Sequence, residues 1–189
     1  MNKGKPLLAY SKQYIDQDDI DTVVDVLRSP FLTQGCRVEE FERDISDFVG
    51  SDYAVAVSSA TAGLMLAYRA MSELLNNTKL LVHVPDITFC STASAALANN
   101  FDISICDVDP NNGLLDISGI SCRFGDLVVP VHYAGAVVDC KKLRELNPGI
   151  GIVEDASHAL GSVDAFGNRV GSCKYSDACV FSFHPVKPI

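Results

Sequence analysis

Residues 151–162 read GIVEDASHALGS, and this stretch decides the fold class. Its first half, residues 151–156, starts apolar and carries two carboxylates, Glu154 and Asp155, near its end, as a buried strand does on reaching a ligand-binding edge. Asp155 would then end a largely dry strand, where a carboxylate needs a partner. That partner is either the protonated nitrogen of a bound heterocycle or the backbone of a loop or helix that the carboxylate caps.

Short apolar runs lie on both sides of this stretch, and helical patterns alternate with them. Strands are expected at residues 53–58, 80–85, 101–109, 126–132, 151–156 and 177–184. Helices are expected at residues 16–28, 38–49, 62–71, 90–99 and 141–146, with Asp16 as N-cap of the first and Gly50 closing the second. Strands that alternate with helices predict an α/β fold, a mostly parallel sheet covered by helices on both faces.

Ligands of such sheets bind beyond the carboxyl ends of the strands, and polar groups follow most of the expected strands. These groups are residues 58–61, 86–89, 132–135, 154–158 and 182–187. No G-x-G-x-x-G follows a strand, and G-x-x-x-x-G-K-[ST] does not occur. The sequence therefore disfavours enzymes that bind NAD or ATP through these loops.

The composition narrows the class of protein further. A hydrophobic fraction of 48% and a charged fraction of 21% are typical of a soluble globular protein. The net charge of −9 argues against nucleic acid as a partner, because a phosphate backbone requires a basic face. No apolar run is long enough to span a membrane, and no signal peptide is recognised, so we expect a cytoplasmic protein. The seven cysteines include no C-x-x-C pair, which predicts free, mostly buried thiols and no metal site.

Four features along the expected ligand edge have two interpretations each. Residues 58–63, SSATAG, could bind an anion at a helix start or simply cap that helix. Phe89 could belong to the core or lie flat on an aromatic ligand. His158 could be structural, and Lys187 could be a surface lysine or a desolvated amine that forms a Schiff base. A phosphate site, an aromatic plate, a carboxylate and an amine are together what pyridoxal 5'-phosphate (PLP) requires.

The sequence also resembles a known family over nearly its whole length. The resemblance is carried by FLTQG (31–35), AVAVSSATAGL (54–64), VPDITFCST (84–92), VPVHYAG (129–135), VEDASHALGS (153–162) and SDACVFSFHPVKPI (176–189). In order and spacing these segments are similar to the DegT/DnrJ/StrS family of nucleotide-sugar aminotransferases, which have the fold-type I large domain of PLP enzymes. Within the family they most resemble the pseudaminic-acid branch, the UDP-4-amino-4,6-dideoxy-N-acetyl-β-L-altrosamine transaminases.

The resemblance implies roles for individual residues. Lys187 matches the lysine that forms the Schiff base with PLP and then moves the reaction's proton. Asp155 matches the carboxylate that keeps the pyridine nitrogen protonated, and Phe89 matches the residue stacked on the ring. His158 matches a position near the 3'-oxygen of the cofactor.

Further matches concern the phosphate and the substrate. Thr61 and Ala62 match the amides that hold the phosphate, with Ser182 as an additional donor. Thr33 lies in a segment that approaches the substrate. The implied reaction transfers an amino group from glutamate to a UDP-linked 4-keto sugar, in a homodimer. Related dehydratases carry histidine where this chain has Lys187, so the lysine favours transamination.

Length is where the chain departs from the family, whose members continue well beyond the lysine. We therefore expect residues 1–189 to form an incomplete PLP-binding large domain, with residues 1–50 as an N-terminal helical segment and the small C-terminal domain absent. One alternative is a catalytically inactive fragment that acts as an interaction or dimerisation subunit. Another is a metal hydrolase using His132, His158, His184 and Asp155, although these residues lack a metal-binding spacing.

Overall fold

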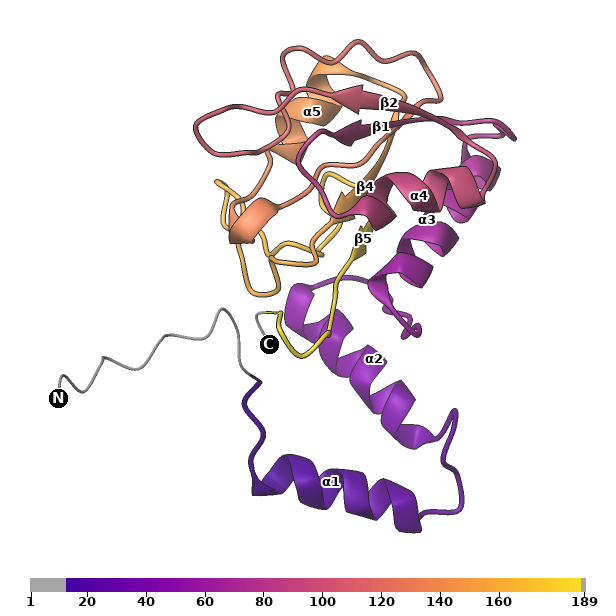
Figure 1. Cartoon of the computed structure of the whole chain (residues 1–189), viewed down its shortest axis with the longest axis vertical. Helices are drawn as coiled ribbons and strands as arrows, with labels where there is room; N and C mark the ends of the chain where they lie inside the picture. Colours follow the sequence, from indigo (N-terminus) through magenta and orange to yellow (C-terminus); the bar gives the residue numbers. More distant parts are fainter. Residues whose placement is uncertain (1–12, 188–189) are drawn as a thin grey trace, which may run out of the picture.

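The computed structural model describes residues 13–187, and a five-stranded parallel sheet lies at its centre (Figure 1). The strand order is β2-β1-β3-β4-β5. The strands are β1 Leu81–Pro85, β2 Asp102–Cys106, β3 Leu127–Val128, β4 Gly151–Asp155 and β5 Ala178–Val180. The predicted α/β fold with a parallel sheet is confirmed, although several strands are shorter than expected. Past Val128, the third strand keeps one further bridge, between Val131 and Asp155.

All five predicted helices are present. They are α1 Gln17–Arg28, α2 Cys36–Val49, α3 Ala60–Leu74, α4 Cys90–Ala98 and α5 Cys140–Leu146, with a short 3-10 turn, η1, at Tyr133–Gly135. Asp16 caps α1 through a capping box with Asp19, as the acidic start of the segment predicts. Gly50 ends α2 in the left-handed conformation, at a φ of 80°, which glycine adopts without a steric penalty.

Helices cover both faces of the sheet because alternate residues of each strand point to opposite sides. Leu127 and Val153 face the core that α3 and α4 complete. Their neighbours Val128 and Ile152 face a second core, which includes Leu143 of α5. The sheet is therefore buried on both sides, as its continuous apolar strands indicate.

Two predictions are wrong. Residues 53–58 form no strand, because no other described strand lies beside them to share backbone hydrogen bonds, and Tyr53 and Val55 are 87% and 77% exposed. The Ala56 amide instead donates to the Glu42 carboxylate at 2.7 Å. The thiols are free but not mostly buried, since Cys140 alone of the seven is buried.

Helix α1 stands apart from the sheet in Figure 1. It buries none of its residues, and its apolar Ile20, Val23 and Leu27 are exposed. Between residues 13 and 187, no helix combines the length and the apolar character needed to cross a membrane.

Candidate active site

Asp155 ends β4 and is only 4% exposed, as predicted. Its Oδ2 accepts a hydrogen bond from the Thr92 hydroxyl at 2.8 Å. Its Oδ1 accepts from the Ser157 hydroxyl at 2.7 Å and from the Ser157 amide at 3.2 Å. The loop-capping interpretation is therefore observed. A carboxylate offers about four lone-pair sites, so capacity for one further donor remains.

A second layer of hydroxyl groups fixes the Asp155 carboxylate. Thr88 donates to the Thr92 hydroxyl oxygen at 2.6 Å, and the Tyr68 hydroxyl donates to the Thr92 carbonyl at 3.0 Å. Burial, and then the charge of Asp155, raise the pKa of Tyr68 well above its usual value, so this phenol keeps its proton. Sequence reasoning missed Thr92, Ser157 and Tyr68, although the first two lie within quoted segments.

Lys187 and His158 lie together, although 29 residues separate them in the chain. The Lys187 Nζ is 2.8 Å from the His158 Nε2, and both side chains are partly buried. Burial, and then the Lys187 charge, lower the pKa of His158, while Asp155 acts in the opposite direction. The imidazole is therefore neutral near pH 7 and accepts a hydrogen bond from the lysine, whose ammonium group has only donors. The Tyr133 ring lies 6.2 Å from the His158 ring.

The start of α3 provides the candidate anion site. Ser59 is the N-cap, and its hydroxyl accepts from the Ala62 amide at 3.2 Å, so the capping interpretation is also observed. Thr61 lies in the same turn, where helix amides lack acceptors within the helix. A Cβ on Gly63 would come within 3.0 Å of Val180 Cγ1, so the glycine lets α3 approach β5 closely.

Of the remaining predicted residues, Ser182 is partly buried, while Phe89 and Thr33 are exposed. Ser182 follows β5 and accepts from the His184 amide at 3.4 Å. Phe89 precedes α4 and is 71% exposed, so the core interpretation is wrong and its ring is free to stack on a ligand. The exposed Thr33 lies in the loop between α1 and α2, which Figure 1 shows apart from the ends of β4 and β5. The structure does not bring Thr33 together with the other candidates.

The histidines of the metal-hydrolase alternative do not converge. His158 contacts Lys187, and His184 Nδ1 accepts from the Val186 amide at 3.4 Å. His132 lies near Cys140 and Glu154, a buried group that could hold a metal ion. However, both ring nitrogens of His132 already have protein partners, the Val138 amide and the Glu154 carboxylate. The described side chains therefore satisfy this group without a metal.

PLP fits the site by the chemistry of its donors. A buried carboxylate with spare acceptor capacity suits a protonated ring nitrogen, and an amine held by a neutral imidazole suits an aldehyde. An exposed aromatic ring and a capped helix start suit the ring and the phosphate. These groups all follow strands or begin helices at the carboxyl edge of the sheet.

Comparisons with known proteins point in the same direction. The model of the DegT/DnrJ/EryC1/StrS aminotransferase family matches residues 13–189. A curated relative, UDP-4-amino-4,6-dideoxy-N-acetyl-beta-L-altrosamine transaminase of Campylobacter jejuni, is 37% identical over 97% of this chain and 49% of its own. UDP-4-amino-4-deoxy-L-arabinose--oxoglutarate aminotransferase of Shewanella sediminis is 34% identical over 93% and 45%.

Solved structures extend the likeness to the fold. PseC of Helicobacter pylori, an aminotransferase involved in the biosynthesis of pseudoaminic acid, has a TM-score of 0.84 at 33% identity, covering 96% of this chain and 49% of that one. The PLP-form of the putative sugar aminotransferase Spr1654 from Streptococcus pneumoniae has a TM-score of 0.81 at 28% identity, covering 95% and 50%. This chain spans about half the length of the relatives it matches.

Proposed function

This chain belongs to the DegT/DnrJ/EryC1/StrS aminotransferase family, and on that premise we propose that it binds PLP through Lys187 as part of a nucleotide-sugar aminotransferase. The observation that carries the proposal is the Lys187–His158 contact on the same edge as buried Asp155. The proposed acceptor is a UDP-linked 4-keto sugar and the proposed donor is glutamate. The names of the Campylobacter and Shewanella relatives support the UDP-sugar class.

When bound, PLP supplies an aldehyde that carries the amino group and a ring that withdraws electrons from the reacting carbon. Lys187 offers its Nζ to the aldehyde, and an amine reacts only when it is uncharged. His158 Nε2 accepts one N–H of Lys187, which keeps the amine turned toward the edge of the sheet. Its lowered pKa keeps the imidazole neutral and able to accept.

Asp155 would hold the ring nitrogen in its protonated form. The carboxylate is fixed from two sides by Thr92 and Ser157, so it meets a positive charge without reorganisation. A hydrogen bond to a charged group of this kind contributes about 1.5–3 kcal/mol.

The phosphate, ring and substrate contacts follow from the same placement. The amides of Thr61 and Ala62 and the hydroxyl of Ser182 would bind the phosphate, since helix-start amides favour anions. Phe89 would stack on the ring, and Thr33 would reach the substrate after movement of its loop or in the complete assembly.

We also propose the domain organisation, the oligomeric state and the location of the protein. Residues 1–189 would be an incomplete large domain, with residues 1–50 as an N-terminal helical segment; residues 1–12 and 188–189 of these ranges lie outside the described residues. The functional enzyme would be a homodimer that acts in the cytoplasm.

The test is cofactor binding by the 189-residue chain. Added PLP should produce a visible absorption band, and borohydride should fix the cofactor to Lys187 as a secondary amine that peptide mass mapping locates. Lys187→Ala should lose the band and the label completely. Lys79→Ala serves as the control, because Lys79 is an exposed lysine that pairs with Asp102 at 3.8 Å at the start of β2. A label on another lysine, or an unchanged band in Lys187→Ala, would refute the proposal.

A further inference from the structure

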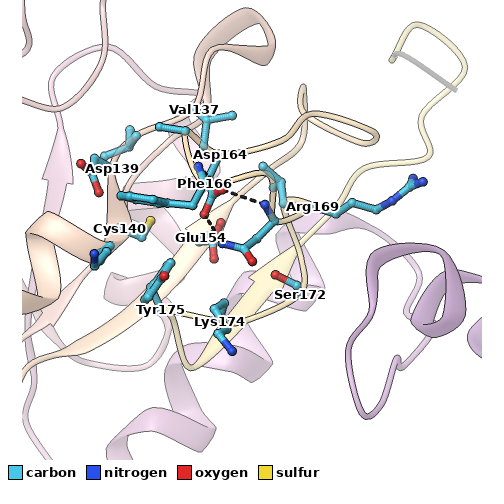
Figure 2. Close-up of a pocket in the computed structure, with 15 residues that line it drawn as sticks. Val137, Asp139, Cys140, Glu154, Asp164, Phe166, Arg169, Ser172, Lys174 and Tyr175 are labelled. Atoms are coloured by element: carbon cyan, nitrogen blue, oxygen red, sulfur yellow. Dashed lines mark hydrogen bonds between the residues drawn. The ribbon is translucent and has the colours of Figure 1, made fainter.

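Glu154 precedes Asp155 on β4, so its side chain points to the opposite face of the sheet. It is 6% exposed. Figure 2 shows it at a pocket that Cys140, Phe166 and Tyr175 also line. None of the residues assigned above to PLP lines this pocket. The proposed function therefore leaves a buried carboxylate on this face without a role.

Two side chains from distant segments hold this carboxylate. His132 Nε2 lies 2.6 Å from Glu154 Oε2, and the Ser176 hydroxyl donates to Oε1. The Val138 amide donates to His132 Nδ1 at 3.1 Å, so the ring proton is on Nε2 and is donated to Glu154. We call His132, Glu154 and Ser176 the back-face cluster.

Each member of the back-face cluster belongs to a segment that leads to the candidate site. His132 precedes Tyr133, whose ring lies beside His158. The His132 amide donates to the Asp155 carbonyl at 3.0 Å, while the Asp155 amide donates to the Pro130 carbonyl at 2.9 Å. The backbone of Asp155 is thus bonded in both directions to the segment that carries His132.

Ser176 connects the cluster to the lysine. It precedes β5, which continues toward Ser182 and Lys187. β5 pairs with β4 at Asp155↔Val180, and the Ala156 amide donates to the Val180 carbonyl at 2.9 Å. The Glu154 carboxylate therefore joins the segments that carry Tyr133, Asp155 and Lys187 to the candidate site.

We propose that Glu154 is a positioning residue, whose bonds to His132 and Ser176 fix the relative placement of Asp155, His158 and Lys187. Packing alone does not require a charge here, since apolar residues of similar volume often stabilise a core as well as a buried ion pair does. Side chains that orient site residues in this way act through geometry and touch no reactant. The expected effect on the cofactor rests on the proposed function; the expected effect on the Lys187–His158 contact does not.

The chain contains a matched control, a second buried pair. His83 Nε2 lies 3.1 Å from Asp126 Oδ2, and both residues are buried. Asp126 precedes β3, at the opposite end of the strands from the site. Asp126→Asn therefore perturbs a buried histidine–carboxylate bond at the end of the sheet away from the candidate site.

The experiment compares the wild-type chain with Glu154→Gln, Ser176→Ala and Asp126→Asn by two readouts. The first is the titration of His158 in the cofactor-free chain, followed by NMR and assigned with His158→Gln. Only four histidines are present, and the charged or titratable groups facing His158 are Lys187, Asp155 and Tyr133. The second readout is the Kd for PLP.

Glu154→Gln should raise the His158 pKa toward its ordinary value, because Lys187 moves away, and should weaken PLP binding about tenfold. Ser176→Ala should shift the His158 pKa and the Kd for PLP in the same direction, but by smaller amounts than Glu154→Gln. If Glu154→Gln does not fold, Ser176→Ala serves as the test, and unchanged readouts in it would overturn the proposal. Asp126→Asn should leave both near wild type. Unchanged readouts in Glu154→Gln, or equal shifts in Asp126→Asn, would overturn the proposal. If wild type binds no PLP, the proposed function fails, while the His158 titration still tests Glu154.

Discussion

The sheet holds two buried histidine–carboxylate pairs, one near each end of its strands, and they are built differently. At the amino end, Asp126 accepts from His83 and from the Arg123 amide at 2.8 Å, so its carboxylate also closes the local turn. At the carboxyl end, Glu154 accepts from His132 and Ser176, each 22 residues away in the chain. Both pairs therefore join segments that are distant in the chain, but Asp126 also closes a local turn, whereas Glu154 is held by side chains alone.

The comparison shows what the position of a pair in a parallel sheet implies. A carboxylate that closes a local turn retains a backbone donor when its histidine is removed. A carboxylate that joins distant segments by side chains alone loses much of its compensation with one substitution. The predictions below test this difference, from the largest expected effect to the smallest.

Removing the histidine should cost more stability at the carboxyl end. His132→Ala leaves Glu154 buried beside a cavity and should lower the free energy of unfolding by about 3–5 kcal/mol. His83→Ala leaves Asp126 with its backbone donor and should cost about 1–3 kcal/mol. Urea denaturation followed by circular dichroism measures both values.

A matched variant separates the effect of losing the hydrogen-bond donor from the effect of the cavity. His132→Gln retains a donor of similar reach and should recover part of the loss. Equal destabilisation by His132→Ala and His83→Ala would mean that the two pairs are equivalent and that the contrast between the two ends is wrong.

Each pair also has a neighbouring cysteine, and their reactivities should differ. Burial, and then the charge of Glu154, raise the pKa of Cys140 well above its usual value. Burial also raises the pKa of half-buried Cys106, whose sulfur lies 3.8 Å from His83 Nδ1. Since the thiolate is the nucleophile, iodoacetamide should label exposed Cys36 and Cys90 first, then Cys106, and Cys140 roughly tenfold more slowly than Cys106.

Timed labelling with peptide mass spectrometry gives the order. Faster labelling of Cys140 than of Cys106 would show that the carboxyl-end core opens more readily than the structure indicates. Glu154→Gln is informative here too, because a loosened cluster should accelerate labelling of Cys140 and leave Cys106 unchanged.

The smallest expected effect is a dependence of stability on pH at the carboxyl end. Burial and the charge of Lys187 lower the pKa of His158 in the folded chain, whereas the unfolded chain titrates near the ordinary value of about 6.5. In the window between these values the unfolded state binds more protons, so His158 makes stability fall as the pH drops through it. Above the ordinary value this contribution vanishes.

Denaturation of wild type and His158→Gln at a series of pH values from about 7.5 to about 5 measures this effect. The variant should lose stability less steeply in that range. An identical slope in both proteins would mean that groups other than His158 cause the loss of stability at low pH. It would also mean that His158 does not contact Lys187 in solution.

The features predicted from the sequence are those set by local pattern. Helical spacing and caps located the five α-helices of residues 13–187, and apolar runs located the five paired strands. The segment at 53–58 has the same apolar pattern but forms no strand, because a strand depends on a partner that its own residues do not specify. Asp155 was identified because a carboxylate at the end of an apolar run is unusual.

The contacts that organise the site could not be predicted in this way. The Thr92–Asp155 bond spans 63 residues, and the Lys187–His158 contact spans 29. Glu154 stood beside Asp155 in the opening segment, yet its partners lie on the other face of the sheet and depend on how β3 and β5 flank β4. The exposure of Phe89 and the incomplete burial of most thiols likewise depend on which surfaces the fold leaves uncovered.

The hydroxyl of Ser59 has a further consequence for any anion at the start of α3. It already accepts a hydrogen bond from the Ala62 amide at 3.2 Å. Because it belongs to the same chain, it competes with any bound anion for this amide at a fixed, high local concentration. A ligand gains only the difference between its own bond and this cap, and the cap contributes about 1 kcal/mol. A doubly charged phosphate would gain more from the helix dipole than a neutral or weakly charged group, and would therefore compete better with the cap. The serine would thus favour charged ligands over neutral ones, and it satisfies the Ala62 amide when no anion is bound.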